Sequence, residues 1–216
     1  MSDTLDTSGA QRIAVSIVVP VRNEADNIAP LVREIAAALE GRWEYEIVYV
    51  NDGSSDATSE RLLSQMKTRS NLRQIRHAVS CGQSSAVRSG VRAARGPIVA
   101  TLDGDGQNDP AFLPELIGAI ERGGGLVGLA AGQRIGRKDT SFKRWQSRAA
   151  NGVRNAVLRD GTRDTGCGLK AFRRDVFLSL PYFDGLHRFL PALVRREGFE
   201  IAGFTPPAGQ HVANAR

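Results

Sequence analysis

Hydrophobic and polar residues alternate along this chain in two different rhythms. Short continuous apolar runs rich in Val and Ile are typical of parallel strands that are covered on both faces. Between them, apolar residues recur every three or four positions, which is the spacing of an amphipathic helix. The runs predict strands at residues 13–19, 46–50, 72–76, 98–102, 126–131, 169–172 and 200–204, the last at a sheet edge.

Helical spacing fills most of the segments between these strands. The first example extends from Ile28 to Leu39, and Gly41 follows where such a helix would end. Strands that alternate with helices predict an α/β fold whose mainly parallel, doubly wound sheet is flanked by helices. The further helices are predicted at residues 57–67, 83–94, 111–121, 142–158 and 189–196.

The length of 216 residues suits one α/β domain, and the chain shows no internal repeat or low-complexity linker. We expect residues 1–12, which are polar, to be a disordered tail. A single domain is then predicted over 13–205, with a first half at 13–132 and a second half at 133–205. Residues 206–216 form a C-terminal tail.

Composition narrows the location and the partners. No apolar run reaches the roughly 18–20 residues of a membrane span, and no signal peptide begins the chain, so a cytoplasmic protein is expected. The net charge is +6, and residues 134–175 hold twelve Lys/Arg against four Asp/Glu. This basic segment suits phosphorylated substrates or anionic lipid, or is only a solvated face. It lacks interleaved aromatics, which argues against nucleic acid. Cys81 and Cys167 have no metal-type spacing and are expected to be reduced and half-buried.

The most specific chemistry follows the strand predicted at 98–102. Asp103, Asp105 and Gln107 bring two carboxylates and an amide oxygen close together, with Gly104 and Gly106 between them. Oxygen ligands are those that Mg²⁺ and Mn²⁺ prefer, and two such carboxylates repel each other unless a cation lies between them. The glycines are expected to leave room for a phosphate group. The segment therefore predicts a metal site that also meets a diphosphate.

Two other interpretations of this segment can be tested on the residues. A calcium-binding EF-hand loop beginning at Asp103 needs glycine and glutamate where the chain has Asn108 and Pro114, so it is excluded. A polar turn in which Asp109 caps a helix that begins at Pro110 is expected. That turn leaves Asp103 and Asp105 unexplained.

Polar clusters also follow two other predicted strands, at Asn23/Glu24 and at Asn51/Asp52. Ligands of open parallel sheets bind beyond the carboxyl ends of the strands, so all three clusters are expected at one edge. The chain has neither a dinucleotide-binding glycine motif nor a P-loop. For Asn23 and Asp52, turn capping is the alternative role.

Five motifs occur along the chain in this order: VVPVRNE at 18–24, VNDGSSD at 50–56, LDGDGQNDP at 102–110, DTGCGLKAFRR at 164–174 and HRFLPA at 187–192. Together they resemble the family-2 glycosyltransferases of GT-A fold. The last two are similar to those of the dolichol-phosphate mannosyltransferase-like subgroup, whose bacterial members glycosylate undecaprenyl phosphate. The resemblance covers residues 13–204 and makes 13–132 the nucleotide-sugar and metal half and 133–205 the acceptor half.

The resemblance assigns roles to the donor side. Pro20, Asn23, Glu24, Asp52 and Asp103 would contact the nucleotide sugar, which is GDP-mannose or a UDP-sugar, and Asp52 would read the base. Mg²⁺ or Mn²⁺ would be held by Asp103, Asp105 and Gln107.

The acceptor side follows in the same way. Arg134 matches a phosphate-binding position and joins Asp103 and Asp105 as a catalytic residue, although a surface ion pair is the alternative for a lone arginine. His187 is either a ligand or a structural histidine, and spacing gives His77 and His211 no role. The candidates for the acceptor phosphate are Arg134, Lys143, Arg144, Ser147 and Arg188, with Asn151 on the same predicted helix as three of them.

The function implied is an inverting transfer of a sugar, with mannose favoured, to a polyprenyl phosphate. The acceptor phosphate is already anionic at neutral pH, so it attacks without a general base. Such an enzyme would lie at the cytoplasmic face of the membrane, on its anionic surface. Two alternatives stay open: a glycosyltransferase with a soluble saccharide or protein acceptor, and an inactive nucleotide-sugar-binding module.

The C-terminus departs from the family pattern. The family continues past its last strand with a His-Arg-Pro-Arg-like stretch and further segments, whereas this chain ends at Arg216, and only His211 matches. We expect a chain truncated relative to the family, or an acceptor-closing element that a separate membrane subunit supplies.

Overall fold

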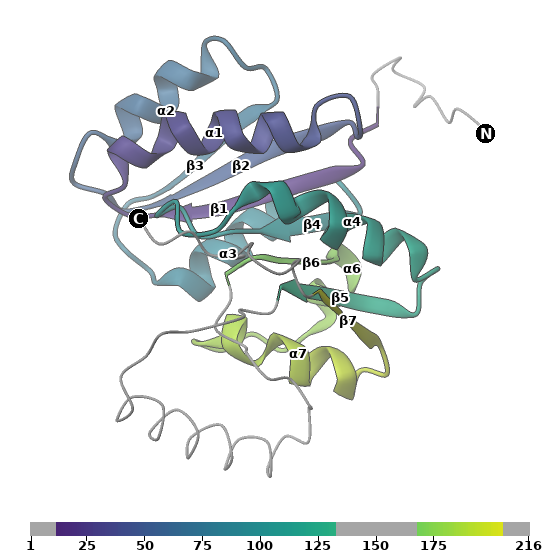
Figure 1. Ribbon diagram of the computed structural model, residues 1–216. Helices are drawn as coiled ribbons and strands as arrows, with labels where there is room; N and C mark the ends of the chain where they lie inside the picture. Colours follow the sequence, from purple (N-terminus) through teal and green to yellow (C-terminus); the bar gives the residue numbers. More distant parts are fainter. Residues whose placement is uncertain (1–11, 133–167, 205–216) are drawn as a thin grey trace, which may run out of the picture.

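A seven-stranded sheet organises the computed structural model, which describes residues 12–132 and 168–204 (Figure 1). The strand order is β3-β2-β1-β4-β6-β5-β7. β6 is antiparallel to β4 and β5, and the other pairings are parallel. The strands are β1 (Val15–Val21), β2 (Tyr45–Asp52), β3 (Leu72–His77), β4 (Ile98–Thr101), β5 (Val127–Gly132), β6 (Lys170–Arg173) and β7 (Glu200–Phe204).

The prediction of a mainly parallel sheet is therefore confirmed, and every predicted strand is present, with β7 at an edge. The reversal of β6 was not predicted, because a run of four residues carries no information on its direction.

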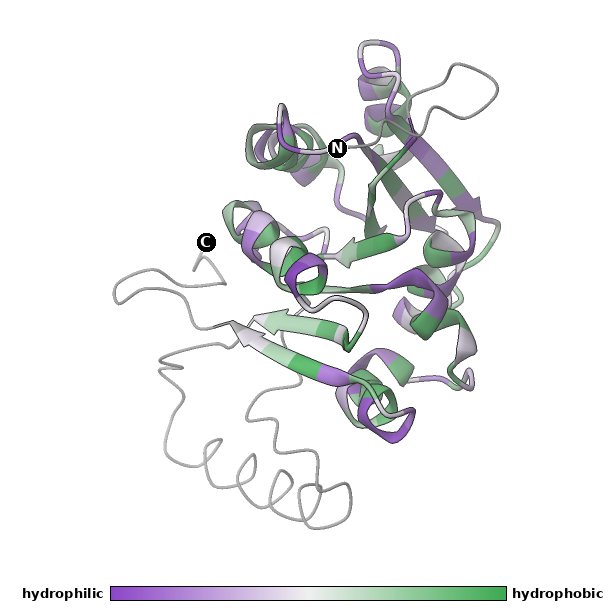
Figure 2. Ribbon diagram, turned by 90° about the vertical axis from the view of Figure 1, so that its right-hand side faces the viewer, coloured by the Kyte–Doolittle hydropathy of each residue, from purple (hydrophilic) through white to green (hydrophobic). Residues whose placement is uncertain are grey.

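Helices cover both faces of the sheet, as the doubly wound prediction requires (Figures 1 and 2). α1 (Ala25–Leu39), α2 (Thr58–Met66) and α4 (Leu113–Arg122) lie on one face. α3 (Gln83–Ala93), α6 (Arg174–Ser179) and α7 (Leu186–Arg196) lie on the other. α6 was not predicted, because six residues are too few to show a helical period. The helix predicted at 142–158 lies outside the described residues.

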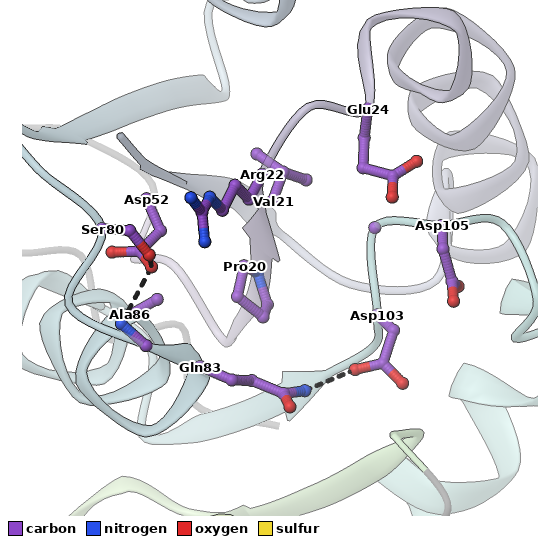
Figure 3. A pocket seen from close by; sticks show the side chains of 12 residues that line it. Pro20, Val21, Arg22, Glu24, Asp52, Ser80, Gln83, Ala86, Asp103 and Asp105 are labelled. Carbon is purple, nitrogen blue, oxygen red and sulfur yellow. Dashed lines mark hydrogen bonds between the residues drawn. The ribbon is translucent and has the colours of Figure 1, made fainter. Parts of the chain in front are cut away.

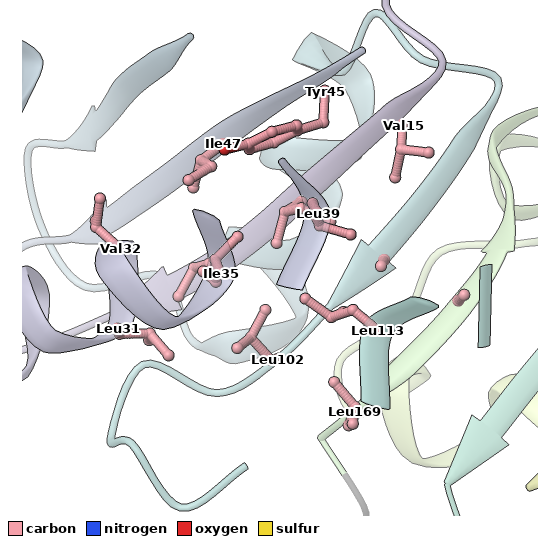
Figure 4. Close-up of a cluster of buried hydrophobic side chains, with 14 of the residues drawn as sticks. Val15, Leu31, Val32, Ile35, Leu39, Tyr45, Ile47, Leu102, Leu113 and Leu169 are labelled. Carbon is pink, nitrogen blue, oxygen red and sulfur yellow. The ribbon is translucent and has the colours of Figure 1, made fainter. Parts of the chain in front are cut away.

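A separate apolar cluster stabilises each face. Figure 4 shows Ile35 and Leu39 of α1 on the same side of the sheet as Ile47 of β2, all three fully buried. Each such side chain contributes roughly 1.5–3 kcal/mol by leaving water. On the other face α3 packs very closely, since a β-carbon at Gly90 would lie 2.4 Å from Val18 Cγ1. The sheet is thus held rigidly between two helical layers, which fixes where its strands end.

The carboxyl ends of β1, β2, β3 and β4 lie at one edge of the sheet, because these strands run in the same direction. A short 3₁₀ helix, η1 (Pro110–Phe112), follows the loop after β4 and leads into α4. The Asp109 carboxylate accepts a hydrogen bond from the Ala111 N–H at 2.9 Å. This confirms the predicted cap at Asp109 and Pro110.

In the part of the chain that the structure describes, no helix combines the length and the apolar character needed to cross a bilayer.

Candidate active site

A hollow of about 430 Å³ opens at the carboxyl edge of the sheet (Figure 3). It brings together five of the residues predicted for the donor side and the metal, which come from the ends of β1, β2 and β4. The convergence expected from strand direction therefore occurs. The lining residues are Pro20, Val21, Arg22, Glu24, Asp52, Ser80, Gly82, Gln83, Ala86, Asp103, Gly104 and Asp105.

Asp103 and Asp105 lie together on one side of the hollow, and Asp52 and Ser80 lie on the opposite side (Figure 3). The Gln83 side-chain amide donates to Asp103 Oδ1 at 2.8 Å, which orients that carboxylate. The Gln107 N–H donates to Asp105 Oδ1 at 3.0 Å. Two carboxylates with hard oxygen donors on one wall form a set that suits Mg²⁺ or Mn²⁺.

The Gln107 side chain is exposed and is not among the residues that line the hollow. What Gln107 supplies in this structure is its backbone N–H, which holds the turn around Asp105. Its role as a metal ligand stays a prediction.

Two glycines are required by close packing around these acids. A β-carbon at Gly104 would lie 2.2 Å from Val21 Cγ1, so the turn packs directly on the end of β1. A β-carbon at Gly168, just before β6, would lie 2.0 Å from Asp103 Oδ2. The missing side chain of Gly104 makes room for Val21, and the expectation that this glycine also leaves room for a phosphate stays a prediction.

The Asp52 carboxylate is buried at the end of β2 and accepts four hydrogen bonds. Oδ1 accepts from His77 Nδ1 at 2.7 Å and from the Cys81 N–H at 2.8 Å. Oδ2 accepts from Ser80 Oγ at 2.8 Å and from the Gly82 N–H at 2.9 Å. Burial alone would raise the pKa of Asp52. The four hydrogen bonds together lower it by more, so the pKa lies below its usual value. Asp52 is ionised at neutral pH and clamps the 80–82 loop to the sheet.

Asn23 and Glu24 join two loops at the same edge. Asn23 has a left-handed backbone (φ 57°), and its Oδ1 accepts from the Ser55 N–H at 2.9 Å. The Glu24 N–H donates to Thr58 Oγ1 at 2.9 Å. Asn23 does not line the hollow, so the structure supports its turn-capping role, and its nucleotide contact stays a prediction.

Arg22, Ser80 and Gln83 line the hollow but were not proposed from the sequence. Among the described residues that line the hollow, Arg22 carries the one positive charge, and four residues carry carboxylates. Arg22 lies inside the motif at 18–24, next to Asn23, and this position could have indicated a role in the site. Ser80 and Gln83 follow the end of β3, where the sequence has no acidic cluster to mark a site.

On the acceptor side, Arg188 is exposed on α7 and does not line the hollow. His187 Nδ1 lies 2.7 Å from Ser84 Oγ, which also accepts the Gly185 N–H at 3.0 Å. Burial lowers the pKa of His187, and the nearby positive charges of Lys170 and Arg188 lower it further. These contacts favour the structural role for His187. The other predicted residues, Arg134, Lys143, Arg144, Ser147 and Asn151, lie outside the described residues.

A second group that could hold a metal is formed by Asp52, His77 and Cys81, whose ligand atoms lie within 4.8 Å of one another. The carboxylate in this group is already satisfied by its four donors, which makes it a hydrogen-bonded clamp rather than an open ligand set. Cys81 is a free, exposed cysteine, so the expectation that it is half-buried is wrong.

The sequence model of "Glycosyl transferase family 2" matches residues 16–180, which is most of the chain. The chain belongs to glycosyl transferase family 2. The resemblance drawn from the five motifs is thereby confirmed for this family 2 protein.

The names of two curated relatives each include a polyprenyl phosphate. A dodecaprenyl-phosphate galacturonate synthase of Rhizobium johnstonii is 35% identical over 189 residues, which cover 85% of this chain and 55% of that protein. An undecaprenyl-phosphate 4-deoxy-4-formamido-L-arabinose transferase of Edwardsiella ictaluri is 35% identical over 182 residues, covering 83% and 55%. The family 2 chain thus spans about half the length of the curated relatives it matches.

Solved structures establish the GT-A fold. A mannosyltransferase of Pyrobaculum calidifontis, in complex with GDP-Man and Mn²⁺, has a TM-score of 0.67 at 23% identity, covering 91% of this chain and 55% of that one. A glucosyl-3-phosphoglycerate synthase of Mycobacterium tuberculosis, in complex with Mn²⁺, UDP and phosphoglyceric acid, has a TM-score of 0.69 at 22% identity, covering 89% and 68%. At these identities the likeness concerns the fold alone.

Proposed function

We propose that this chain is the catalytic domain of an inverting glycosyltransferase that moves a sugar from a nucleotide diphosphate sugar to a polyprenyl phosphate. The observation that carries the proposal is the hollow in which Asp103 and Asp105 face Asp52 across the carboxyl edge of the sheet. The names of the relatives support a polyprenyl phosphate acceptor. Because the chain spans about half the length of those relatives, the activity of the whole protein is part of the proposal.

Asp103 and Asp105, with Gln107 as a third candidate, would hold Mg²⁺ or Mn²⁺. The bound ion would supply neutralisation of the diphosphate and so stabilise the departing nucleoside diphosphate. Asp103 and Asp105 suit such an ion because their carboxylates offer hard oxygen donors and lie on the same side of the hollow.

The chain's own groups bind and orient the donor. Arg22 offers a guanidinium to an anionic ligand inside an otherwise acidic hollow. Asp52 fixes the 80–82 loop, so that Ser80 and Gly82 present a defined wall to the nucleoside. Gln83 holds the Asp103 carboxylate in place. Catalysis then depends on positioning and charge neutralisation.

A general base is not required, because a phosphate monoester is already anionic at neutral pH. The described residues agree with this mechanism, since both of their histidines are engaged elsewhere: His77 contacts Asp52 and His187 contacts Ser84. The acceptor phosphate would be bound by Arg134, Lys143, Arg144, Ser147 and Arg188, which remain candidates from the sequence.

GDP-mannose and UDP-sugars are the two donor classes in the proposal. The subgroup resemblance favours mannose, whereas the names of the relatives specify galacturonate and 4-deoxy-4-formamido-L-arabinose. With a lipid acceptor, the protein would lie at the cytoplasmic membrane face, on an anionic surface. A separate membrane subunit is one candidate source of an acceptor-closing element.

The test is a transfer assay with a panel of nucleotide sugars, Mn²⁺ and vesicles that contain polyprenyl phosphate. We expect lipid-linked sugar from the wild-type chain and none from Asp105→Ala, while Glu115→Ala, an exposed acid on α4, keeps wild-type activity. Circular dichroism checks that each variant folds.

Turnover retained by Asp105→Ala with added Mg²⁺ or Mn²⁺ would overturn the proposal. Transfer to a soluble saccharide or protein but not to lipid would favour the second activity. Nucleotide-sugar binding without any turnover would favour a binding module.

A further inference from the structure

Three side chains from three elements form a hydrogen-bonded series behind the hollow. His77, the last residue of β3, lies between Asp52 of β2 and Ser89 of α3. Its Nδ1 is 2.7 Å from Asp52 Oδ1, and its Nε2 is 2.9 Å from Ser89 Oγ. Both ring nitrogens are therefore occupied, and the ring has one orientation.

The direction of these bonds follows from the ionised Asp52 carboxylate. A carboxylate only accepts, so the ring must donate through Nδ1–H. In the neutral ring Nε2 then has to accept, and the Ser89 hydroxyl donates to it. In either protonation state of the ring, Nδ1–H donates to Asp52 and the Ser89 hydroxyl contacts Nε2, so the ring is held between the two.

His77 differs from the other three donors to Asp52 in where it is anchored. Ser80, Cys81 and Gly82 belong to the loop that lines the hollow, and their bonds to the carboxylate move with that loop. His77 is the strand partner of Asp52 in the parallel β2–β3 pair. It therefore fixes the carboxylate to the sheet independently of the loop.

We propose that His77 is a positioning residue for the donor: held by Ser89, it orients the Asp52 carboxylate that shapes the nucleoside side of the hollow. The inference rests on the proposed function, because it requires that a nucleotide binds in this hollow. It gives a role to a histidine that sequence spacing left without one.

The order Ser, His, Asp is also that of a hydrolytic triad. The cavity argues against that role here, because neither Ser89 nor His77 is among the residues that line the hollow. A nucleophile needs room beside it for a substrate carbonyl, and Asp52 is the one member of the series that the hollow reaches.

The experiment measures GDP and UDP binding by titration calorimetry with Mn²⁺, and donor KM and kcat where turnover occurs. We expect about tenfold weaker binding and a raised KM with unchanged kcat for His77→Ala, since a hydrogen bond to a charged group is lost. His77→Asn should stay within about threefold of wild type, because its amide can donate to Asp52. Ser89→Ala should fall between them.

Gln74→Ala is the matched control. Gln74 also lies on β3, but its side chain bonds Ser59 Oγ of α2 at 3.1 Å, on the opposite face of the sheet. Gln74→Ala removes one half-buried hydrogen bond from the same strand and leaves the contacts of Asp52 unchanged. We expect wild-type nucleotide affinity from Gln74→Ala.

Equal affinity in His77→Ala and Gln74→Ala would overturn the inference, as would an equal loss in His77→Ala and His77→Asn, or a lowered kcat with unchanged KM. Ester hydrolysis that Ser89→Ala abolishes would show a nucleophile instead. If His77→Ala does not fold, His77→Asn and Ser89→Ala decide the question. If the wild-type chain binds no nucleotide at all, the proposed function fails first.

Discussion

Replacing Gly168 by alanine tests whether the position of the Asp103 carboxylate controls catalysis. The added β-carbon would lie 2.0 Å from Asp103 Oδ2, and real β-carbon contacts are essentially never shorter than 3.0 Å. Either the carboxylate or the backbone before β6 must therefore move by about 1 Å. A misplacement of about 1 Å can cost roughly 10²-fold in rate. We expect kcat to fall about 10²-fold.

The expected loss of stability is small by comparison. The Gly168 backbone is not left-handed, so alanine brings no backbone strain and gains roughly 0.4–1 kcal/mol from the unfolded chain. Relieving the steric overlap costs roughly 1–3 kcal/mol. The free energy of unfolding should therefore fall by no more than about 2.6 kcal/mol, and the variant stays folded.

The assay is transfer from a radiolabelled nucleotide sugar over a Mn²⁺ titration, with urea unfolding in parallel. Gly118→Ala is the control, because its β-carbon would meet only the tip of the flexible Arg122 side chain, at 2.9 Å. A Gly168→Ala enzyme with wild-type kcat and wild-type Mn²⁺ dependence would refute the reasoning.

Three further predictions concern charge. The Glu46 side chain is 2% exposed and lies 2.7 Å from Arg73, so Glu46→Ala should lower the free energy of unfolding by roughly 3 kcal/mol. A loss under about 1 kcal/mol in urea unfolding would contradict this. Arg22→Ala should raise the donor KM about tenfold without changing the melting temperature, since a charged hydrogen bond to the ligand is lost. An unchanged KM would exclude Arg22 as a donor ligand. Burial lowers the pKa of His187 below its ordinary 6.5, so the unfolded chain binds the proton first as pH falls. Stability should therefore be lower at pH 5.5 than at pH 7.5, and His187→Asn should shrink that difference; the same difference in both proteins would rule the cause out.

Much of the fold could be predicted because each strand and each longer helix has its own hydrophobic period. The direction of β6 depends instead on partners distant in sequence, since it pairs with β4 and β5. α6 is too short for a period and is held by Val176 and Phe177 in the second apolar cluster.

The site was predictable wherever acidic or amide residues directly follow a strand, as at Asp52, Asp103 and Asp105. His77 was missed because its partners are 25 and 12 residues away and come from different elements, which no local spacing reveals. Gln83 was missed for a similar reason, since it reaches Asp103 only across the folded edge.

The reversed direction of β6 has an architectural consequence. β5 runs parallel to β4, so β5 ends, at Gly132, on the same rim as the hollow. The chain returns to the sheet on this rim at Gly168, beside Asp103. The backbone joins the two points directly, through the Gly132 N–H and the Leu169 carbonyl at 3.3 Å. The interval 133–167 therefore leaves and rejoins the described fold at the rim that carries Asp103. Because both ends of this interval meet the described fold at one rim, a change in its length or sequence would leave the order of the strands as it is.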